Sequence, residues 1–375
     1  MSRTGHPSDT SLRERLAELT LELIRIPSVT GDEAALADYL LAWARAQPQL
    51  GADDVLRDGN AVAVGSPDPH RPCLALVGHT DTVPPHPDAP PVGRDSDRIV
   101  GRGASDMKGA LAVMLALGER LELATLPFSL LLVFYDHEEG AYANNGLQPL
   151  LERYELLTQA DLAIAMEPTD NTLQLGCVGG LQATVTFRGR AAHSARPWQG
   201  RNAIHAAGDF LSRLETRPVR DVEVGGLIFR EVMSATMASG GQARNMVPDR
   251  FDINVNYRFA PRPPIDTAVE RAIAELETQA TGADIDIYDV APPGPVPADN
   301  PLLRHLRSLS ELPTQPKQAW TDVARMAQFG LDAINFGPGF AGEAHQKNEW
   351  VSLNALEYSY SVLHTLLTTP LPPSD

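Results

Sequence analysis

The feature that most constrains this chain is a set of short apolar runs separated by helical segments. Residues 73–77, 129–135 and 161–166 are such runs, and each is long enough for a strand but too short for a typical helix. Between them, residues 107–121 and 147–156 carry apolar side chains at helical spacing. Strands that are apolar on both faces need helices on both sides of their sheet, so this pattern predicts an α/β fold.

The same pattern extends toward both ends of the chain. Leucines at helical spacing predict two helices ahead of the first strand, at residues 11–26 and 32–46. After residue 301, helical and buried-strand patterns return over residues 302–309, 321–329, 333–336 and 353–367. We therefore expect the two ends of the chain to share one domain.

The middle of the chain has a different texture. Residues 182–188, 233–238 and 251–259 alternate apolar and polar side chains, which predicts strands with one buried face, and residues 202–214 predict a helix. A chain of 375 residues is also long enough for two domains. We predict a discontinuous α/β domain with a mixed central sheet flanked by helices, interrupted by an inserted α+β domain. The first covers residues 1–177 and 292–375, and the second covers residues 178–291.

Charge and cysteine content exclude several classes of function. The chain has 48 acidic and 31 basic side chains, and this formal net charge of −17 repels nucleic acid and anionic membrane surfaces. An anionic small substrate would need local arginines in its pocket. Cys73 and Cys177 are the two cysteines, which indicates neither a disulfide framework nor a cysteine-based zinc site. The N-terminal residues 2–7 lack the apolar stretch of a signal peptide, and no run approaches the ~18 consecutive apolar residues of a membrane helix, which favours a cytoplasmic protein.

Histidine and carboxylate side chains follow the apolar runs. His79 comes soon after the first run, and Asp81 lies two residues further on, where its carboxylate can bond the second imidazole nitrogen. Glu138 and Glu139 follow the second run as adjacent acids, an arrangement that is costly unless a cation binds one of them. This pair indicates one metal ligand and one general base.

Three further residues complete the pattern. Asp106 lies in a glycine-rich turn that opens a helix, where an N-cap is the more common role for aspartate. Glu167 ends the third apolar run, and its alternative role is that of a solvated loop acid. His345 lies in a polar loop near the C-terminus. Taken together, imidazole and carboxylate groups at strand ends and tight turns predict a two-metal site.

The order and spacing of these residues resemble a known family. It comprises di-zinc aminoacylases and exopeptidases and includes succinyl-diaminopimelate desuccinylase, acetylornithine deacetylase and related carboxypeptidases. The resemblance rests on residues 79–84, 103–109, 138–140 and 167–169 and on His345. It implies that the discontinuous domain is a di-zinc catalytic domain and that the inserted domain is a dimerisation or lid domain.

The resemblance also assigns the metal ligands. His79 and Glu167 would bind one zinc ion, Glu139 and His345 would bind the other, and Asp106 would bridge the two. Cobalt and manganese are the alternative metals.

Further roles follow from the same resemblance. Glu138 would be the general base for an attacking water activated by the two cations, and Asp81 would orient His79. In a homodimer, His193 of the inserted domain would stabilise the oxyanion in the partner's active site, and Asn245 would contact substrate. From the residues alone, His193 has two equal interpretations, because its arginine-flanked strand end fits an anion contact as well as a structural role.

Longer stretches are similar to the actinobacterial succinyl-diaminopimelate desuccinylases of this family. They are residues 134–136, 190–196, 202–207, 255–261 and 320–325. The implied reaction is hydrolysis of N-succinyl-LL-2,6-diaminopimelate to succinate and LL-2,6-diaminopimelate. Because that small N-acyl amino-acid substrate carries several carboxylates, candidate substrate-binding residues are Arg196, Arg258, Arg325 and Thr321. An ordinary ion pair is the alternative role for each arginine.

Other functions stay open within the family. An N-acetyl-lysine or N-acetylornithine deacetylase and a metallo-dipeptidase or carboxypeptidase would use the same metal ligands. A catalytically silent binding protein is a further alternative, and it predicts that a ligand or the general base is missing. All of these positions are filled in this chain.

Overall fold

The computed structural model describes residues 11–372 as two compact units. The first unit contains the chain up to Gly176 together with Pro297–Gln315 and the C-terminal part from Thr321. The second unit contains Cys177–Val296 and Pro316–Trp320. No helix among the described residues is both long and apolar enough to cross a membrane.

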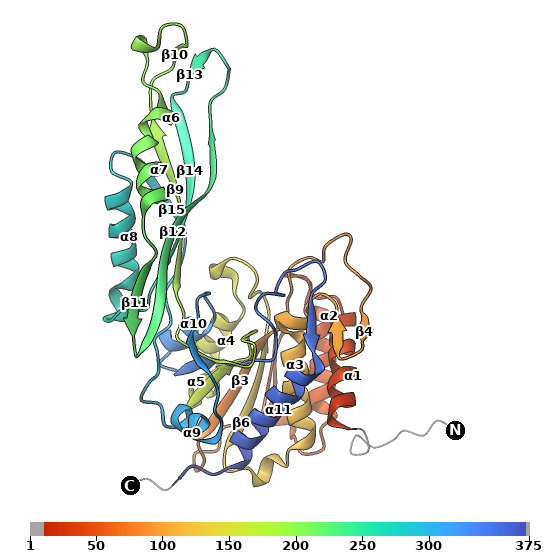
Figure 1. Cartoon of the computed structure of the whole chain (residues 1–375). Coiled ribbons are helices and arrows are strands. Elements are labelled where there is room, and N and C mark those ends of the chain that lie inside the picture. Colours follow the sequence, from red (N-terminus) through yellow and green to blue (C-terminus); the bar gives the residue numbers. More distant parts are fainter. Residues whose placement is uncertain (1–10, 373–375) are drawn as a thin grey trace. The chain divides into compact units, whose positions relative to one another are not determined.

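An eight-stranded mixed sheet forms the centre of the first unit (Figure 1). Strands β6, β3, β7 and β17 run parallel to one another at its centre, and β2 and β8 add antiparallel neighbours on either side. In spatial order the strands are β1 (Val55–Asp58), β2 (Ala61–Val64), β6 (Ser129–Tyr135), β3 (Cys73–His79), β7 (Leu162–Ala165), β17 (Ala333–Asn335), β8 (Leu173–Leu175) and β16 (Thr314–Pro316). A small separate sheet contains β18 (Trp350–Ser352), β5 (Arg98–Val100) and β4 (Gly93–Asp95).

Helices cover this sheet because its central strands are apolar on both faces. Every residue of β3 and β6 is buried. Helices α1, α3 and α11 pack against one another, with α3 on β3, while α10 packs on β7 and β17. The helices of the unit are α1 (Leu12–Arg25), α2 (Ala34–Arg45), α3 (Gly109–Arg120), α4 (Leu147–Arg153), α5 (Glu155–Thr158), α9 (Pro301–Leu309), α10 (Val323–Gln328) and α11 (Leu353–Thr368). The predicted α/β fold with a mixed, helix-flanked sheet is confirmed.

The second unit is built on a five-stranded antiparallel sheet with helices on one face (Figure 1). Its strand order is β11 (Arg220–Val224), β12 (Leu227–Gly240), β14 (Arg250–Phe259), β9 (Gly179–Arg188) and β15 (Asp284–Ala291). Burial alternates along β9 and β14, because one face packs on the helices and the other does not. The helices are α6 (Ala203–Ala206), α7 (Gly208–Thr216) and α8 (Ala268–Gln279), and a short ladder joins β10 (Ala192–His193) to β13 (Met246–Val247).

Two local expectations were wrong. The single helix predicted at residues 202–214 is divided at Ala207, where α6 ends and α7 begins. The sequence also placed Cys177 and residues 292–296 in the first domain, but they belong to the second unit. The same holds for the segment Pro316–Trp320. Its contacts explain this placement, because the carbonyl of Lys317 accepts from the Val178 amide at 3.3 Å and the Trp320 indole donates to the Pro292 carbonyl at 3.0 Å.

Both cysteines are buried, which predicts that neither thiol reacts with thiol reagents in the folded protein. Cys73 is 2% exposed and Cys177 is fully buried, and burial raises the pKa of the Cys73 thiol to about 12. Because the thiolate is the reactive form, we expect neither thiol to react with Ellman's reagent at mildly alkaline pH. Both should react once guanidinium unfolds the chain. Rapid labelling of the folded protein would contradict the burial of these side chains.

Candidate functional site

The predicted site residues of the first unit gather at one edge of its sheet. Strands β3, β6 and β7 are parallel, so their carboxyl ends lie at the same edge. His79 is the last residue of β3, Glu138 and Glu139 follow the end of β6, and Glu167 follows the end of β7. The sheet therefore brings together side chains that are up to 88 residues apart in the sequence, the distance from His79 to Glu167.

His79 is held with one ring nitrogen toward the rest of the cluster. Its side chain is 1% exposed, and its Nδ1 lies 3.0 Å from the backbone carbonyl oxygen of Asp81. Its Nε2 lies 3.1 Å from Oδ1 of Asp106. Burial disfavours the charged imidazole, but Asp106 and Asp81 outweigh burial and raise the pKa of His79 well above its usual value. If Nδ1 carries the proton, Nε2 is free to bind a metal ion.

The Asp81 carboxylate connects β3 to the turn after β6. It lies 3.5 Å from the Nδ1 of His79, and its two oxygens accept hydrogen bonds from the amides of Glu138 at 2.9 Å and Glu139 at 3.0 Å. The Thr30 hydroxyl donates to one of these oxygens at 2.9 Å. Burial disfavours the ionised form, yet His79 and the two amides lower the pKa of Asp81 to about 2. The sequence predicted only the contact with His79.

Asp106 lies in a turn whose backbone amides bond to the Glu349 carboxylate. Glu349 is 2% exposed, and its carboxylate accepts from the amides of Gly103 at 3.0 Å, Ser105 at 2.8 Å and Asp106 at 2.9 Å. Gly103 adopts a φ of +84°, a left-handed conformation that glycine tolerates without strain. Arg102 donates to the same carboxylate at 2.6 Å. The sequence analysis gave no role to Glu349, although it is an acid directly before a strand in the polar loop already singled out.

Asp106 faces two different histidines. Its Oδ1 is near His79, and its Oδ2 lies 3.6 Å from Nε2 of His345. The same Nε2 of His345 lies 3.0 Å from the Glu139 carboxylate, and this hydrogen bond raises the pKa of His345. His345 adopts a left-handed φ of +64°. The loop thus turns its imidazole toward the carboxylates.

Close backbone packing joins the His345 loop to Glu167. A Cβ atom on Gly337 would lie 2.4 Å from the carbonyl oxygen of Glu167, and one on Gly339 would lie 2.1 Å from that of Ser105. The amide of Gly337 also donates to the Thr169 hydroxyl at 3.0 Å. Only glycine permits these approaches, so the Gly337-Pro338-Gly339 turn brings the loop onto two of the other segments.

Glu138 lies in a crowded and strongly acidic environment. Its side chain is partly buried. Burial raises the pKa of Glu138 well above its usual value, and Glu167, Asp322 and Glu139 act in the same direction against the opposing effect of His79. A carboxyl group whose pKa is raised by its surroundings is suited to general acid–base chemistry.

The donor set fits divalent metal ions. His79, Asp106 and Glu139 each offer a ligand atom, and these atoms lie within 4.8 Å of one another. His345 adds an imidazole beside Asp106 and Glu139. Carboxylates gathered this closely repel each other unless cations balance them, and imidazole with carboxylate is a ligand set that zinc accepts.

Comparison with known proteins gives the family. The sequence model of peptidase family M20/M25/M40 matches residues 75–369. This chain belongs to peptidase family M20/M25/M40. A Mycobacterium tuberculosis protein assigned as a succinyl-diaminopimelate desuccinylase is 37% identical over 358 residues, which cover 95% of this chain and 99% of the relative. The succinyl-diaminopimelate desuccinylase of Corynebacterium glutamicum is 34% identical over 336 residues, 88% of this chain and 90% of the relative.

A solved structure shares the fold of this chain. The crystal structure of aminopeptidase PepT from Bacillus cereus has a TM-score of 0.76 to this chain at 18% sequence identity. The match covers 95% of this chain and 98% of that one. At this identity the likeness concerns the fold.

Candidate residues of the second unit fall into two groups. His193 pairs with Met246 in the β10–β13 ladder, and the Ser194 amide donates to the Asn245 carbonyl at 2.8 Å. The Arg196 amide donates to the His193 carbonyl at 2.8 Å, so His193, Asn245 and Arg196 are neighbours. Arg258 lies near the far end of β14, eight residues beyond its start, which corresponds to about 27 Å of extended strand.

Arg325 does not have the exposure expected of a substrate-binding arginine. It is 1% exposed, its Nε donates to Asp322 at 2.9 Å, and its Nη2 donates to the Tyr142 carbonyl at 2.8 Å. A third hydrogen bond reaches Gln148. The prediction of a substrate contact is therefore corrected to a buried structural ion pair, because the guanidinium is enclosed. Thr321 is also 1% exposed, and its hydroxyl donates to Asn335 at 2.8 Å.

Asp322 anchors the loop after β6, a role that sequence reasoning missed. Its Oδ2 accepts from the Tyr135 hydroxyl at 2.7 Å and from the Asn145 side chain at 2.8 Å. Its Oδ1 accepts from Arg325. This buried network fixes both ends of the segment that carries Glu138 and Glu139. Asp322 lies within residues 320–325, a stretch that resembles the family. That resemblance was the one sequence feature that could have indicated its role.

Glu349 provides a test of how the Asp106 turn is held. Replacing Glu349 by alanine leaves three backbone amides, two of them buried, and Arg102 without this acceptor, so we expect the free energy of unfolding to fall by about 3 kcal/mol. Urea unfolding of the metal-free protein measures this loss. Glu343→Ala is the matched control, because the described contacts give the Glu343 side chain no hydrogen bond. Equal stability of the two variants would contradict the role of Glu349.

Proposed function

We propose that this chain hydrolyses the N-succinyl amide of N-succinyl-LL-2,6-diaminopimelate, releasing succinate and LL-2,6-diaminopimelate. The observation that carries the proposal is the match, over 95% of the chain, to a relative assigned as a succinyl-diaminopimelate desuccinylase. The carboxylate and imidazole cluster at the strand ends supports the same metal-dependent amide hydrolysis. In this proposal the enzyme acts in the cytoplasm.

In this proposal two zinc ions share the cluster. His79 and Glu167 would hold one ion, Glu139 and His345 would hold the other, and Asp106 would be a ligand shared by both. The two oxygens of Asp106 support this assignment, because each lies near a different histidine. When bound, the two ions supply Lewis acidity, which polarises the amide carbonyl and makes water easier to deprotonate.

Glu138 is the proton carrier of the proposed reaction. It removes a proton from the attacking water as the water oxygen bonds to the amide carbon. It then delivers that proton to the amine nitrogen as the carbon–nitrogen bond breaks, so succinate and a free amine leave. The Asp81 carboxylate holds the amides of Glu138 and Glu139, which keeps the base and the adjacent ligand at a fixed spacing.

In this proposal, residues of the second unit stabilise the reaction intermediate and bind the substrate. His193 stabilises the negative oxygen that forms on the amide carbon, acting from the partner subunit of a homodimer. Arg196 and Asn245 lie beside His193 and bind substrate from the same side. Arg258 lies far along β14, so within one subunit it would not meet the same substrate molecule as His193. Arginine forks suit carboxylates, and they are needed in a chain of net charge −17.

A substrate panel tests the proposed acyl group. Purified zinc-loaded protein should hydrolyse N-succinyl-LL-2,6-diaminopimelate with a higher kcat/KM than N-acetylornithine, N-acetyl-lysine or a dipeptide. The product amine, measured with ninhydrin, reports the rate for every substrate. Removing the metal with a chelator should abolish turnover, and adding zinc should restore it. Faster turnover of an acetylated substrate would show that the chain is a deacetylase instead.

Complementation between two variants tests the shared site. Glu138→Gln and His193→Ala should each lower kcat by about 100-fold or more as homodimers. If His193 acts on the partner subunit, a co-expressed mixed dimer contains one intact site and one doubly altered site. With random assembly, one site in four is intact, so about a quarter of wild-type activity should return. No recovery in a confirmed mixed dimer would place both residues in the same subunit's site.

A further inference from the structure

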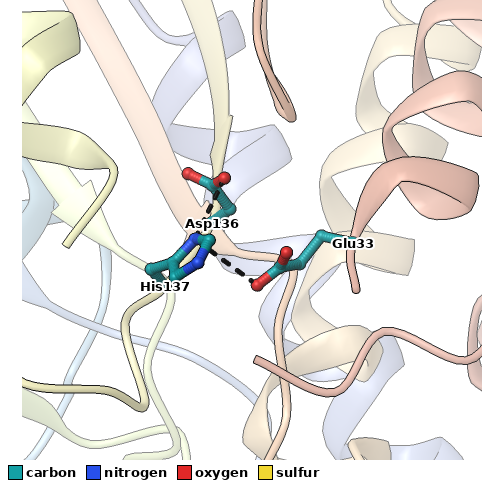
Figure 2. A group of neighbouring side chains, drawn as sticks. All are labelled: Glu33, Asp136 and His137. Carbon is teal, nitrogen blue, oxygen red and sulfur yellow. Dashed lines mark ion pairs between the residues drawn. The ribbon is translucent and has the colours of Figure 1, made fainter. Parts of the chain in front are cut away.

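A second group of ionisable side chains lies next to the candidate site. Glu33, Asp136 and His137 meet in Figure 2, where dashed lines join the imidazole to both carboxylates. The Nδ1 of His137 lies 3.1 Å from Asp136 and 3.6 Å from Glu33. None of these residues belongs to the ligand set proposed above. His137, however, directly precedes Glu138 in the sequence.

Glu33 is a buried carboxylate at the start of α2. Its exposed fraction is 0%, and it occupies the N-cap position of the helix. One carboxylate oxygen accepts from the Gly31 amide at 2.7 Å, and the other lies 3.4 Å from the Asn60 amide group. A fully buried carboxylate is costly unless its partners compensate for lost water. Among the described contacts, His137 is its one partner from the β6 turn.

His137 has an uncommon backbone conformation. Its φ is +59°, in the left-handed region that a few per cent of residues other than glycine adopt, with asparagine, aspartate and histidine the most frequent among them. A side chain held in this region needs surrounding contacts that outweigh the cost. The contacts with Asp136 and Glu33 provide them, because they fix the imidazole on the side of the turn that faces α2.

The segment 28–33 is attached to both ligand-bearing segments. Toward the end of β3, the Ser28 hydroxyl donates to the Thr80 carbonyl at 2.7 Å and the Thr30 amide donates to the Thr82 carbonyl at 3.1 Å. Toward the β6 turn, Thr30 donates to the Asp81 carboxylate that holds Glu138 and Glu139, and Glu33 meets His137. The segment 28–33 therefore contacts the parts of the chain that hold the proposed base and two of the proposed metal ligands in place.

We propose that Glu33 and His137 are positioning residues that set the orientation of the Glu138–Glu139 turn. This inference rests on the proposed function, because it gives the turn a general base and a metal ligand. In this proposal the pair touches neither substrate nor metal. Its effect passes through the backbone of the turn, whose other anchor is the Asp81 carboxylate.

Glu33→Gln tests the proposal while keeping the size of the side chain. The amide can still accept from Gly31, but it loses the charge that meets His137. Supporting contacts of this kind typically change activity or metal affinity by about 10-fold to 100-fold, so we expect kcat to fall by about tenfold or more with KM little changed. Zinc titration of the metal-free protein should show weaker binding at one of two sites. Asp38→Asn is the control, because Asp38 lies on the helix that Glu33 caps and its exposed carboxylate pairs only with Arg57 of β1 among the described contacts.

Two variants of His137 separate the imidazole from the backbone conformation. Glycine adopts the left-handed φ readily but has no side chain to meet Glu33, so His137→Gly should lose as much kcat as Glu33→Gln. Asparagine tolerates the same φ and keeps a polar group, so His137→Asn should retain more activity than glycine. A double variant with Glu33→Gln and His137→Gly should be little worse than either single variant.

Several outcomes would overturn the proposal. Wild-type kcat and zinc binding in Glu33→Gln or His137→Gly would show that the contact does not position the turn. A third zinc ion per subunit in the wild type, absent from Glu33→Gln at unchanged kcat, would make the cluster a cation site. If the wild type hydrolyses none of the acylated substrates, the proposed function fails, and zinc titration of the variants still decides the positioning role.

Discussion

The arrangement of the candidate site depends on one buried carboxylate. Asp81 accepts both backbone amides of the Glu138–Glu139 turn and lies beside the imidazole of His79. One side chain thereby sets the distance between the end of β3 and the segment after β6. Parallel strands bring these segments to the same edge, but they do not fix the loops beyond the strand ends. The Asp81 carboxylate supplies that constraint.

Other segments reach the site through the same kind of interaction. Glu349 holds the Asp106 turn through three amides, and Asp322 holds Tyr135 and Asn145 on either side of the β6 turn. Each is a buried carboxylate whose lone pairs are filled by protein donors, which offsets the loss of water. The carboxylates proposed to bind metal differ from these, because they face one another and cations would balance their charge. The two groups of acids therefore differ in what compensates their negative charge: protein hydrogen-bond donors for the structural acids, and cations for the proposed metal ligands.

The second unit presents its candidate residues in a different way. His193 lies in a two-residue ladder, Arg196 and Asn245 lie in the loops beside it, and backbone hydrogen bonds link the three residues. Arg258 lies on a long strand of the same unit, well away from them. Residues spread in this manner cannot surround one small substrate within their own unit. The proposal of a homodimer whose partner contributes His193 accounts for that separation.

The sequence by itself determined the α/β class, the strands that carry the site and the acids and histidines that follow them. It could do so because apolar runs and the residues at their ends are local features. It could not decide which acids hold other segments in place, because the roles of Glu349 and Asp322 depend on amides and side chains far away in the chain. It also made Arg325 a substrate-binding candidate, whereas packing encloses it beside Asp322. The tertiary structure decided these roles because burial and hydrogen-bond partners are set by contacts between distant segments.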